Sequence, residues 1–192
     1  MHRLEGRRKG GVWVGGVAFL KMIFTAHADG RLDLAGRMAP CALGKAGVVA
    51  ARDKREGDGA SPAGTWPLRR VLYRPDRGGA PATRLPARAL TADDGWCEAP
   101  DDENYNRLVS LPHGASAEWL WREDGLYDLI AVLGHNDAPV VPGAGSAIFL
   151  HLARADYGPT RGCVALARSD LEALLAAARP SDALAISPHP AP

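Results

Sequence analysis

The chain has 192 residues, of which 46% are hydrophobic and 23% charged, and its formal net charge is +1. A chain of this length and composition fits one globular domain with a buried core. The near-neutral balance excludes a general electrostatic attraction to nucleic acid or to an anionic membrane surface. No run of about 18 or more apolar residues occurs, so we expect no membrane-spanning helix.

The N-terminal segment over residues 1–21 differs in composition from the rest of the chain. Four Arg and Lys side chains precede a short, Gly-rich apolar run over residues 11–20, in the order found in secretory signals. However, Lys21 follows this run at once, and the small-residue cleavage site is poor. We expect residues 1–21 to be a disordered or signal-like extension, or to lie upstream of a true start at Met22. Residues 22–189 are expected to form the domain.

Alternation of apolar and polar residues predicts strands along most of this domain. The segments concerned are residues 22–28, 31–34, 65–73, 126–133, 146–152, 163–166 and 183–187. Segments rich in Gly, Pro and Asp over 54–64 and 74–104 predict loops. Ser169 is the expected N-cap of the one predicted helix, which runs to Ala178. The pattern therefore indicates a mainly β fold, a β-sandwich or open barrel with one C-terminal helix.

The three cysteines, Cys41, Cys97 and Cys163, form no CxxC pair and have no zinc-finger spacing with histidine. An odd number leaves at least one thiol unpaired within the chain, while a disulfide between Cys41 and Cys97 stays open. His135, His151 and Cys163 have the right chemistry for metal ligands, but no short HxH pair or carboxylate cluster accompanies them. We therefore expect neither a metal nor a cofactor.

Cys163 is the strongest candidate for a catalytic residue. Gly162 precedes it and allows the backbone to approach a substrate closely, and successive N–H groups at such a turn can point at a developing oxyanion. Arg161 and a neighbouring imidazole would favour the thiolate over the thiol. The alternative is a buried cysteine that packs as a small hydrophobic side chain.

Two histidines compete for the role of the base that activates this thiol. His151 closes an apolar run 12 positions before Cys163, so its side chain is expected to project from a sheet into a cleft. His135 follows the apolar run over residues 126–133 and is the competitor. We favour His151 as the base.

Four segments, taken together and in order, resemble the L,D-transpeptidase catalytic domain (YkuD-like) family. Residues 54–66 (KREGDGASPAGTW) resemble a loop segment of that family, and residues 134–137 (GHND) resemble a pocket segment of one bacterial branch. Residues 148–151 (IFLH) resemble its catalytic-histidine strand, and residues 160–164 (TRGCV) resemble its nucleophile motif. Together these segments cover most of the predicted domain.

The resemblance implies acyl transfer in peptidoglycan without a cofactor, with stem peptides as partners and with possible covalent modification by a carbapenem. Cys163 would be the nucleophile and His151 the acid and base, while Gly162 would shape the oxyanion site with the Cys163 N–H. Thr160 stands where the family has Ser or Thr, and His135 and Asn136 stand in its pocket segment, so the resemblance implies that these three residues bind substrate. Such chemistry implies export to the periplasm or cell envelope.

The sequence departs from the family pattern around the nucleophile. Arg161 replaces a frequent histidine, and Ala165 stands where many members have an arginine linked with the substrate carboxylate. Arg161 and Arg154 are candidates for the missing cation. Two rival functions stay open: an L,D-carboxypeptidase or amidase on the same site, in which water accepts the acyl group, and a non-catalytic cell-wall-binding domain.

The aromatic residues of the long loop have two interpretations. Trp96 with Cys97, and Tyr105 with Asn106, are either a lid or groove wall that contacts substrate, or a local cluster that anchors the loop.

Overall fold

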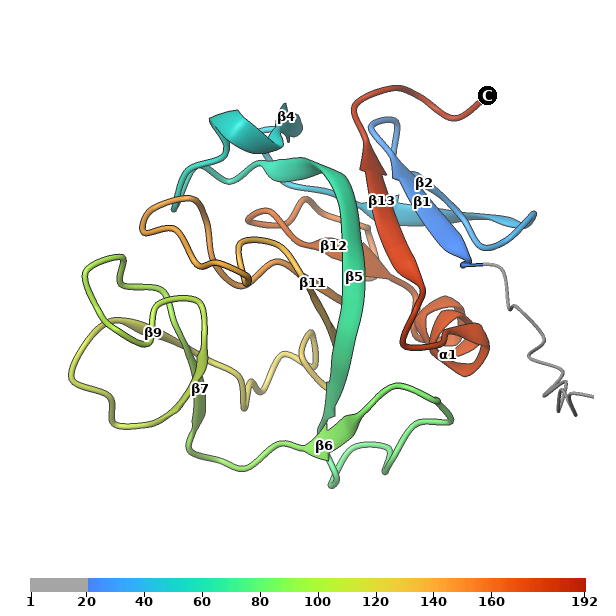
Figure 1. The fold of residues 1–192 in the computed structure, drawn as a ribbon. Helices are drawn as coiled ribbons and strands as arrows, with labels where there is room; N and C mark the ends of the chain where they lie inside the picture. The colour runs from blue at the N-terminus through green and yellow to red at the C-terminus, as the bar shows by residue number, and fades with distance from the viewer. Residues whose placement is uncertain (1–20) are drawn as a thin grey trace, which may run out of the picture.

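The computed structural model describes residues 21–192 (Figure 1). The extension predicted over residues 1–21 lies outside the described residues, apart from Lys21. The strands are β1 (Ile23–His27), β2 (Arg31–Asp33), β3 (Met38–Ala42), β4 (Val48–Ala50), β5 (Ser61–Tyr73), β6 (Ala87–Ala89), β7 (Asp94–Cys97), β8 (Leu108–Ser110), β9 (Ala117–Trp119), β10 (Leu129–Leu133), β11 (Phe149–Leu152), β12 (Val164–Leu166) and β13 (Ala183–Ser187). The helices are the 3-10 turn η1 (Ala51–Asp53) and α1 (Arg168–Ala177).

Eight strands form a closed barrel in the order β10-β11-β12-β3-β2-β1-β13-β5, and pairing of β5 with β10 completes the circuit. The length of β5 makes this closure possible: residues 64–67 pair with β13, and residues 68–73 pair with β10. Strands β4 and β6 pair with β5 outside the circuit. The predicted mainly β fold with one C-terminal helix is confirmed, and the structure adopts the barrel.

Strands β10 and β11 are buried on both faces, so alternate residues enter two different hydrophobic clusters. In β10, Leu129, Ala131 and Leu133 join a large cluster that includes the leucines of α1, whereas Ile130 and Val132 join a second cluster. In β11 the same alternation sends Leu150 to the first cluster and Phe149 to the second. Because His151 is two residues from Phe149, it lies on the face of the second cluster.

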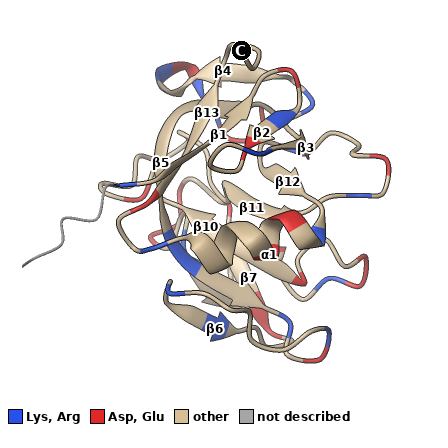
Figure 2. Cartoon of the chain, turned by 90° about the vertical axis from the view of Figure 1, so that its right-hand side faces the viewer, with Lys and Arg blue, Asp and Glu red and all other residues tan. Residues whose placement is uncertain are grey.

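The helix α1 begins at Arg168, with Ala167 as the N-cap and no side-chain hydrogen bond at the cap. The predicted N-cap at Ser169 is therefore wrong, because Ser169 is already in the first turn. Leu171, Leu174 and Leu175 are buried and secure the helix, so packing rather than capping determines where it lies. Figure 2 shows α1 beside β11, on a face where basic and acidic segments are interspersed, in keeping with the low net charge.

A small second sheet in the order β8-β7-β9 stands to one side of the barrel (Figure 1). Strands β6 and β7 lie within the predicted loop over residues 74–104, so this part of the loop prediction is wrong. The physical reason is that Asp and Gly in β7, of sequence DGWC, are poor strand formers, so this segment becomes a strand through its pairing with β8 and β9. Trp96 of β7 and Leu120, which follows β9, pack in the second hydrophobic cluster and so attach the small sheet to the barrel.

Among residues 21–192, no helix is long and apolar enough to cross a membrane.

Candidate active site

The two principal candidates lie on neighbouring strands of the barrel. Cys163 immediately precedes β12, which runs parallel to β11, and the register pairs Leu150 with Val164 and His151 with Ala165. Cys163 and His151 both line one cavity of about 230 Å³. The parallel pairing therefore brings together two residues that are 12 positions apart in the sequence.

The Cys163 thiol is buried and held by two backbone groups. Its Sγ accepts a hydrogen bond from the Phe149 N–H at 3.4 Å and donates one to the Ala147 carbonyl at 3.1 Å. Burial, followed by the negative charge of Glu118, raises the pKa of the thiol to about 12. At rest Cys163 is therefore a thiol, and a base would have to take its proton before the sulfur could act as a nucleophile.

Ala147, which precedes β11, has a positive φ of 51°. This left-handed conformation is rare for alanine and carries strain, which clusters at functional sites. Here it places the Ala147 carbonyl against the Cys163 sulfur. The apolar pattern around Ala147 gives no sign of this conformation, so sequence reasoning missed it.

His151 is buried, and its imidazole is in the neutral form that can accept a proton. Its Nδ1 lies 2.9 Å from the Leu152 carbonyl oxygen, which only accepts hydrogen bonds, so the Nδ1 atom carries the proton and Nε2 has the free lone pair. Burial lowers the pKa of His151 to about 4. The Tyr127 ring packs edge-on against the imidazole, with 5.3 Å between centroids. The imidazole is thus oriented and neutral near pH 7.

The segment before Cys163 is fixed by two hydroxyl groups. The Thr160 hydroxyl donates to the Cys163 carbonyl at 2.7 Å and accepts from the Gly162 N–H at 3.1 Å. The Ser61 hydroxyl donates to the Gly162 carbonyl at 2.8 Å and accepts from the Gly44 N–H at 2.9 Å. Thr160, predicted to bind substrate, also lines the cavity, but its hydroxyl is engaged within the loop. Ser61 was not singled out from the sequence.

Gly162 is required by both its conformation and its surroundings. Its φ is 136°, which side chains rarely adopt, and a Cβ added there would lie 2.9 Å from the Ala60 carbonyl oxygen. The loop over residues 54–66 can therefore approach the segment before Cys163 closely only because residue 162 is a glycine.

Charged side chains of both signs surround the thiol. Arg161, the predicted substrate-binding cation, lines the cavity, as does Arg154. The other charged residues that line it are Lys45, Lys54, Glu56, Glu98, Glu118 and Arg122. Glu98 and Glu118 belong to the region of the small sheet, so this region forms part of the cavity wall. The aromatic residues themselves anchor it: the Trp96 ring packs edge-on against Phe149, and its Nε1 donates to Asn106 Oδ1 at 2.9 Å.

The structure does not bring His135 and Asn136 to this cavity. His135 is buried against Trp66, with 4.8 Å between ring centroids, and burial and then Lys54 lower its pKa to about 4. The Asn136 amide donates to the carbonyls of Val141 and Gly145 at 3.0 and 2.9 Å, which closes the loop that follows β10. Among the described residues, the lining of the cavity includes neither side chain. The contacts of His135 and Asn136 instead fix the loop that follows β10.

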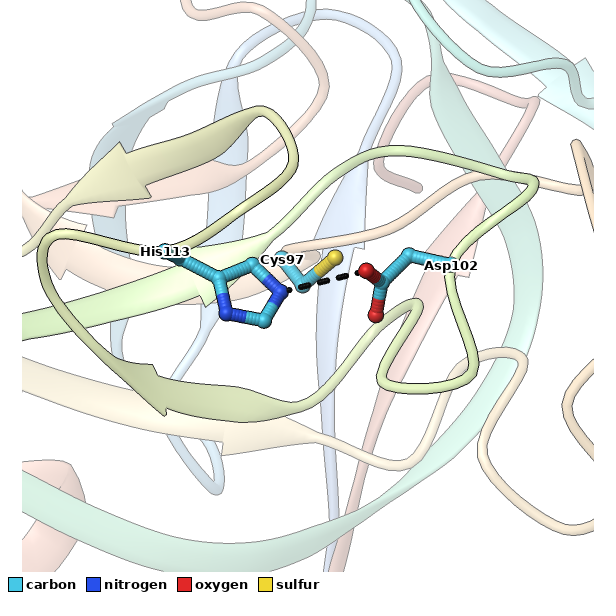
Figure 3. A group of neighbouring side chains, drawn as sticks. All are labelled: Cys97, Asp102 and His113. Carbon is cyan, nitrogen blue, oxygen red and sulfur yellow. Dashed lines mark ion pairs between the residues drawn. The ribbon is translucent and has the colours of Figure 1, made fainter.

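The remaining thiols lie elsewhere, and all three cysteines are free. Cys41 is in the large hydrophobic cluster. Cys97, Asp102 and His113 meet on the small sheet, with their potential ligand atoms within 4.8 Å of one another (Figure 3). Structural zinc sites almost always have four protein ligands, whereas this group has three. His113 Nε2 lies 3.3 Å from Asp102 Oδ2.

Comparison with known protein families identifies the family of the chain. The model of the L,D-transpeptidase catalytic domain family (YkuD) matches residues 22–186. The chain therefore belongs to the L,D-transpeptidase catalytic domain family, as the four sequence segments predict. Membership implies an enzyme of this class. None of the curated proteins matches the chain.

Two solved structures from Mycobacterium tuberculosis are similar to the chain. L,D-transpeptidase 1 is 13% identical with a TM-score of 0.38, over 87% of this chain and 62% of that one. L,D-transpeptidase 3, in complex with a faropenem-derived adduct, is 11% identical with a TM-score of 0.41, over 86% of this chain and 59% of that one. The chain thus spans about three fifths of the length of each.

Proposed function

We propose that this chain is a cysteine acyltransferase of the L,D-transpeptidase type, which forms an acyl-enzyme with a peptidoglycan stem peptide through Cys163. The observation that carries the proposal is that a buried thiol and a neutral, oriented imidazole line the same cavity. A binding domain needs neither group, which disfavours a non-catalytic role. Because peptidoglycan lies outside the cytoplasmic membrane, the proposal places the protein in the periplasm or cell envelope.

In the first half of the reaction, His151 Nε2 takes the proton of the Cys163 thiol as the sulfur attacks the carbonyl carbon of the scissile peptide bond. The Cys163 N–H, beside Gly162, donates to the oxyanion that forms. As the C–N bond breaks, the protonated His151 returns the proton to the departing amine. The products are a thioester on Cys163 and a free D-amino acid.

In the second half, an acceptor attacks the thioester carbonyl and transfers one proton to His151, which then protonates the departing Cys163 sulfur. An amine acceptor gives a new peptide bond, whereas water gives the carboxylic acid. Both outcomes use the same two residues, so the walls of the cavity determine the acceptor. Arg161 is the proposed partner for a carboxylate of the stem peptide, because it lines the cavity close to the nucleophile.

The test is turnover of a tetrapeptide stem with and without a second stem that offers an amine. We expect the wild-type protein to release D-alanine and to form the cross-linked product, and we expect Cys163→Ala to do neither. Mass spectrometry of the products distinguishes a new amide from a free acid. A free acid as the only product would identify a carboxypeptidase, and equal turnover by Cys163→Ala would refute the thiol mechanism.

A further inference from the structure

Glu118 is an acidic residue in an unexpected place, the wall of the cavity that contains the nucleophile. It belongs to β9 of the small sheet, opposite Trp96 of β7 in the register. Its side chain lines the same cavity as Cys163 and His151 and is 17% exposed. Its negative charge also raises the pKa of the Cys163 thiol, after burial. Glu118 therefore opposes formation of the thiolate when the cavity is empty.

The fold satisfies this carboxylate only in part. Among the described residues, the one hydrogen bond to Glu118 comes from the Tyr127 hydroxyl, at 2.9 Å from Oε1. Arg122 Nη1 is 3.7 Å away, but the Nε and Nη2 atoms of Arg122 both donate to Asp124. Arg122 is thus already paired with another carboxylate. Burial raises the pKa of Glu118, and the Tyr127 hydrogen bond and the charges of Arg122 and Arg161 offset this only in part.

A buried carboxylate that lacks a full partner and faces a substrate cavity is suited to bind a cation. The most compact organic cation on a peptide is a primary ammonium group, whose three N–H donors match the free acceptor positions of a carboxylate. A bound ammonium group would also cancel the unfavourable effect of Glu118 on the thiolate. Occupation of the site by such a substrate would therefore favour attack by Cys163.

We propose that Glu118 binds a primary ammonium group of the stem peptide, so that the cavity selects amine-bearing substrates. This inference rests on the function proposed above and names the group that the cavity recognises. The ammonium group could belong to the donor stem, whose peptide bond is cleaved, or to the acceptor stem. Both have the same chemistry, and the experiment separates them.

The experiment compares stem peptides with a free side-chain amine and the same peptides with that amine acetylated, in the wild type and in Glu118→Gln. The glutamine keeps an oxygen that can accept from the Tyr127 hydroxyl but loses the charge. In the donor arm, acylation of Cys163 is followed by intact mass. In the acceptor arm, the acyl-enzyme is formed first, and its decay is measured against the concentration of a free amine acceptor.

If the donor supplies the cation, the wild type should acylate about 10-fold or more faster with the free amine than with the acetylated peptide, and this ratio should fall toward one in Glu118→Gln. If the acceptor supplies it, Glu118→Gln should raise the KM for the amine acceptor about 10-fold or more. Glu172→Gln is the matched control, because it makes the same change of charge on α1, and Glu172 does not line the cavity. It should preserve both values.

Tyr127→Phe gives a second control, since it removes the hydrogen bond to Glu118 but keeps both the charge and the ring against His151. Discrimination between free and acetylated amines should persist in this variant even if the overall rate changes. Unchanged discrimination and an unchanged acceptor KM in a folded Glu118→Gln would overturn the inference while leaving the acyl-enzyme mechanism intact. Absence of any acyl-enzyme in the wild type, with every donor, would overturn both.

Discussion

Replacing His151 with glutamine is expected to slow acylation of Cys163 by about 10²- to 10⁴-fold, the usual contribution of a general base. The effect should be at the upper end of this range because burial raises the pKa of the thiol to about 12, so little thiolate forms unaided. Glutamine can keep the contact to the Leu152 carbonyl through its amide N–H but has no basic lone pair at the position of Nε2. Acylation by a carbapenem, followed over time by intact mass, measures the effect.

The matched control is His135→Gln, which replaces the competing histidine outside the cavity. We expect its acylation rate to stay within about 10-fold of the wild-type rate, because His135 contacts Trp66 and does not line the cavity. The opposite pattern, in which His135→Gln abolishes acylation and His151→Gln does not, would show that His151 is not the base.

The second large effect is expected on stability, from the pH dependence of His135. Burial lowers the pKa of His135 to about 4 from 6.5, so in acid the unfolded chain binds a proton that the folded chain does not. The folded state therefore loses stability as the pH falls through 6.5 toward 4. For a shift of this size, the loss attributable to His135 is about 3 kcal/mol. His135→Phe should remove this contribution, since phenylalanine does not titrate.

Urea unfolding at pH 7 and at pH 4.5 measures the effect. The free energy of unfolding should fall less between these two pH values in His135→Phe than in the wild type, by about 2–3 kcal/mol. His151 has a similarly lowered pKa and remains in both proteins, so both should keep part of the pH dependence. Identical pH dependence in the two proteins would contradict a neutral, buried His135.

The sequence predicts the parts of the site that lie on strongly apolar strands. His151 and Cys163 belong to segments whose apolar runs identify β11 and β12, and the order of the family segments relates the two. Parallel pairing of these strands then places both residues at one cavity. Gly162 is similarly predictable, because a glycine before a nucleophile indicates a close approach of the backbone.

His135 shows why a plausible pocket residue can lie elsewhere. Both His135 and His151 come at or after the end of an apolar run, which makes them look equivalent in the sequence. However, the two side chains lie against different hydrophobic clusters. His151 is on the face of β11 that carries Phe149, whose cluster also contains Cys163, whereas His135 packs against Trp66, which contacts the other cluster. The cluster that each histidine faces depends on tertiary packing, which periodicity does not reveal.

Glu118 and Ser61 could not be predicted from local sequence. Glu118 lies on a three-residue strand that faces the cavity only because β7, β8 and β9 pair across long loops. Ser61 follows a loop of glycines, and its hydroxyl meets Gly162, which is 101 positions away. Both contacts depend on tertiary packing, which overrides the local signal from short strands and turns.

The most direct test of the central claim is the intact mass of the protein after incubation with a carbapenem. Wild-type protein should gain the mass of one carbapenem molecule, because the Cys163 thiolate opens the β-lactam ring and retains all its atoms. Cys163→Ala should gain none, although Cys41 and Cys97 remain in place. An adduct of equal yield on folded Cys163→Ala, or no adduct on folded wild type, would contradict Cys163 as the acyl-forming nucleophile.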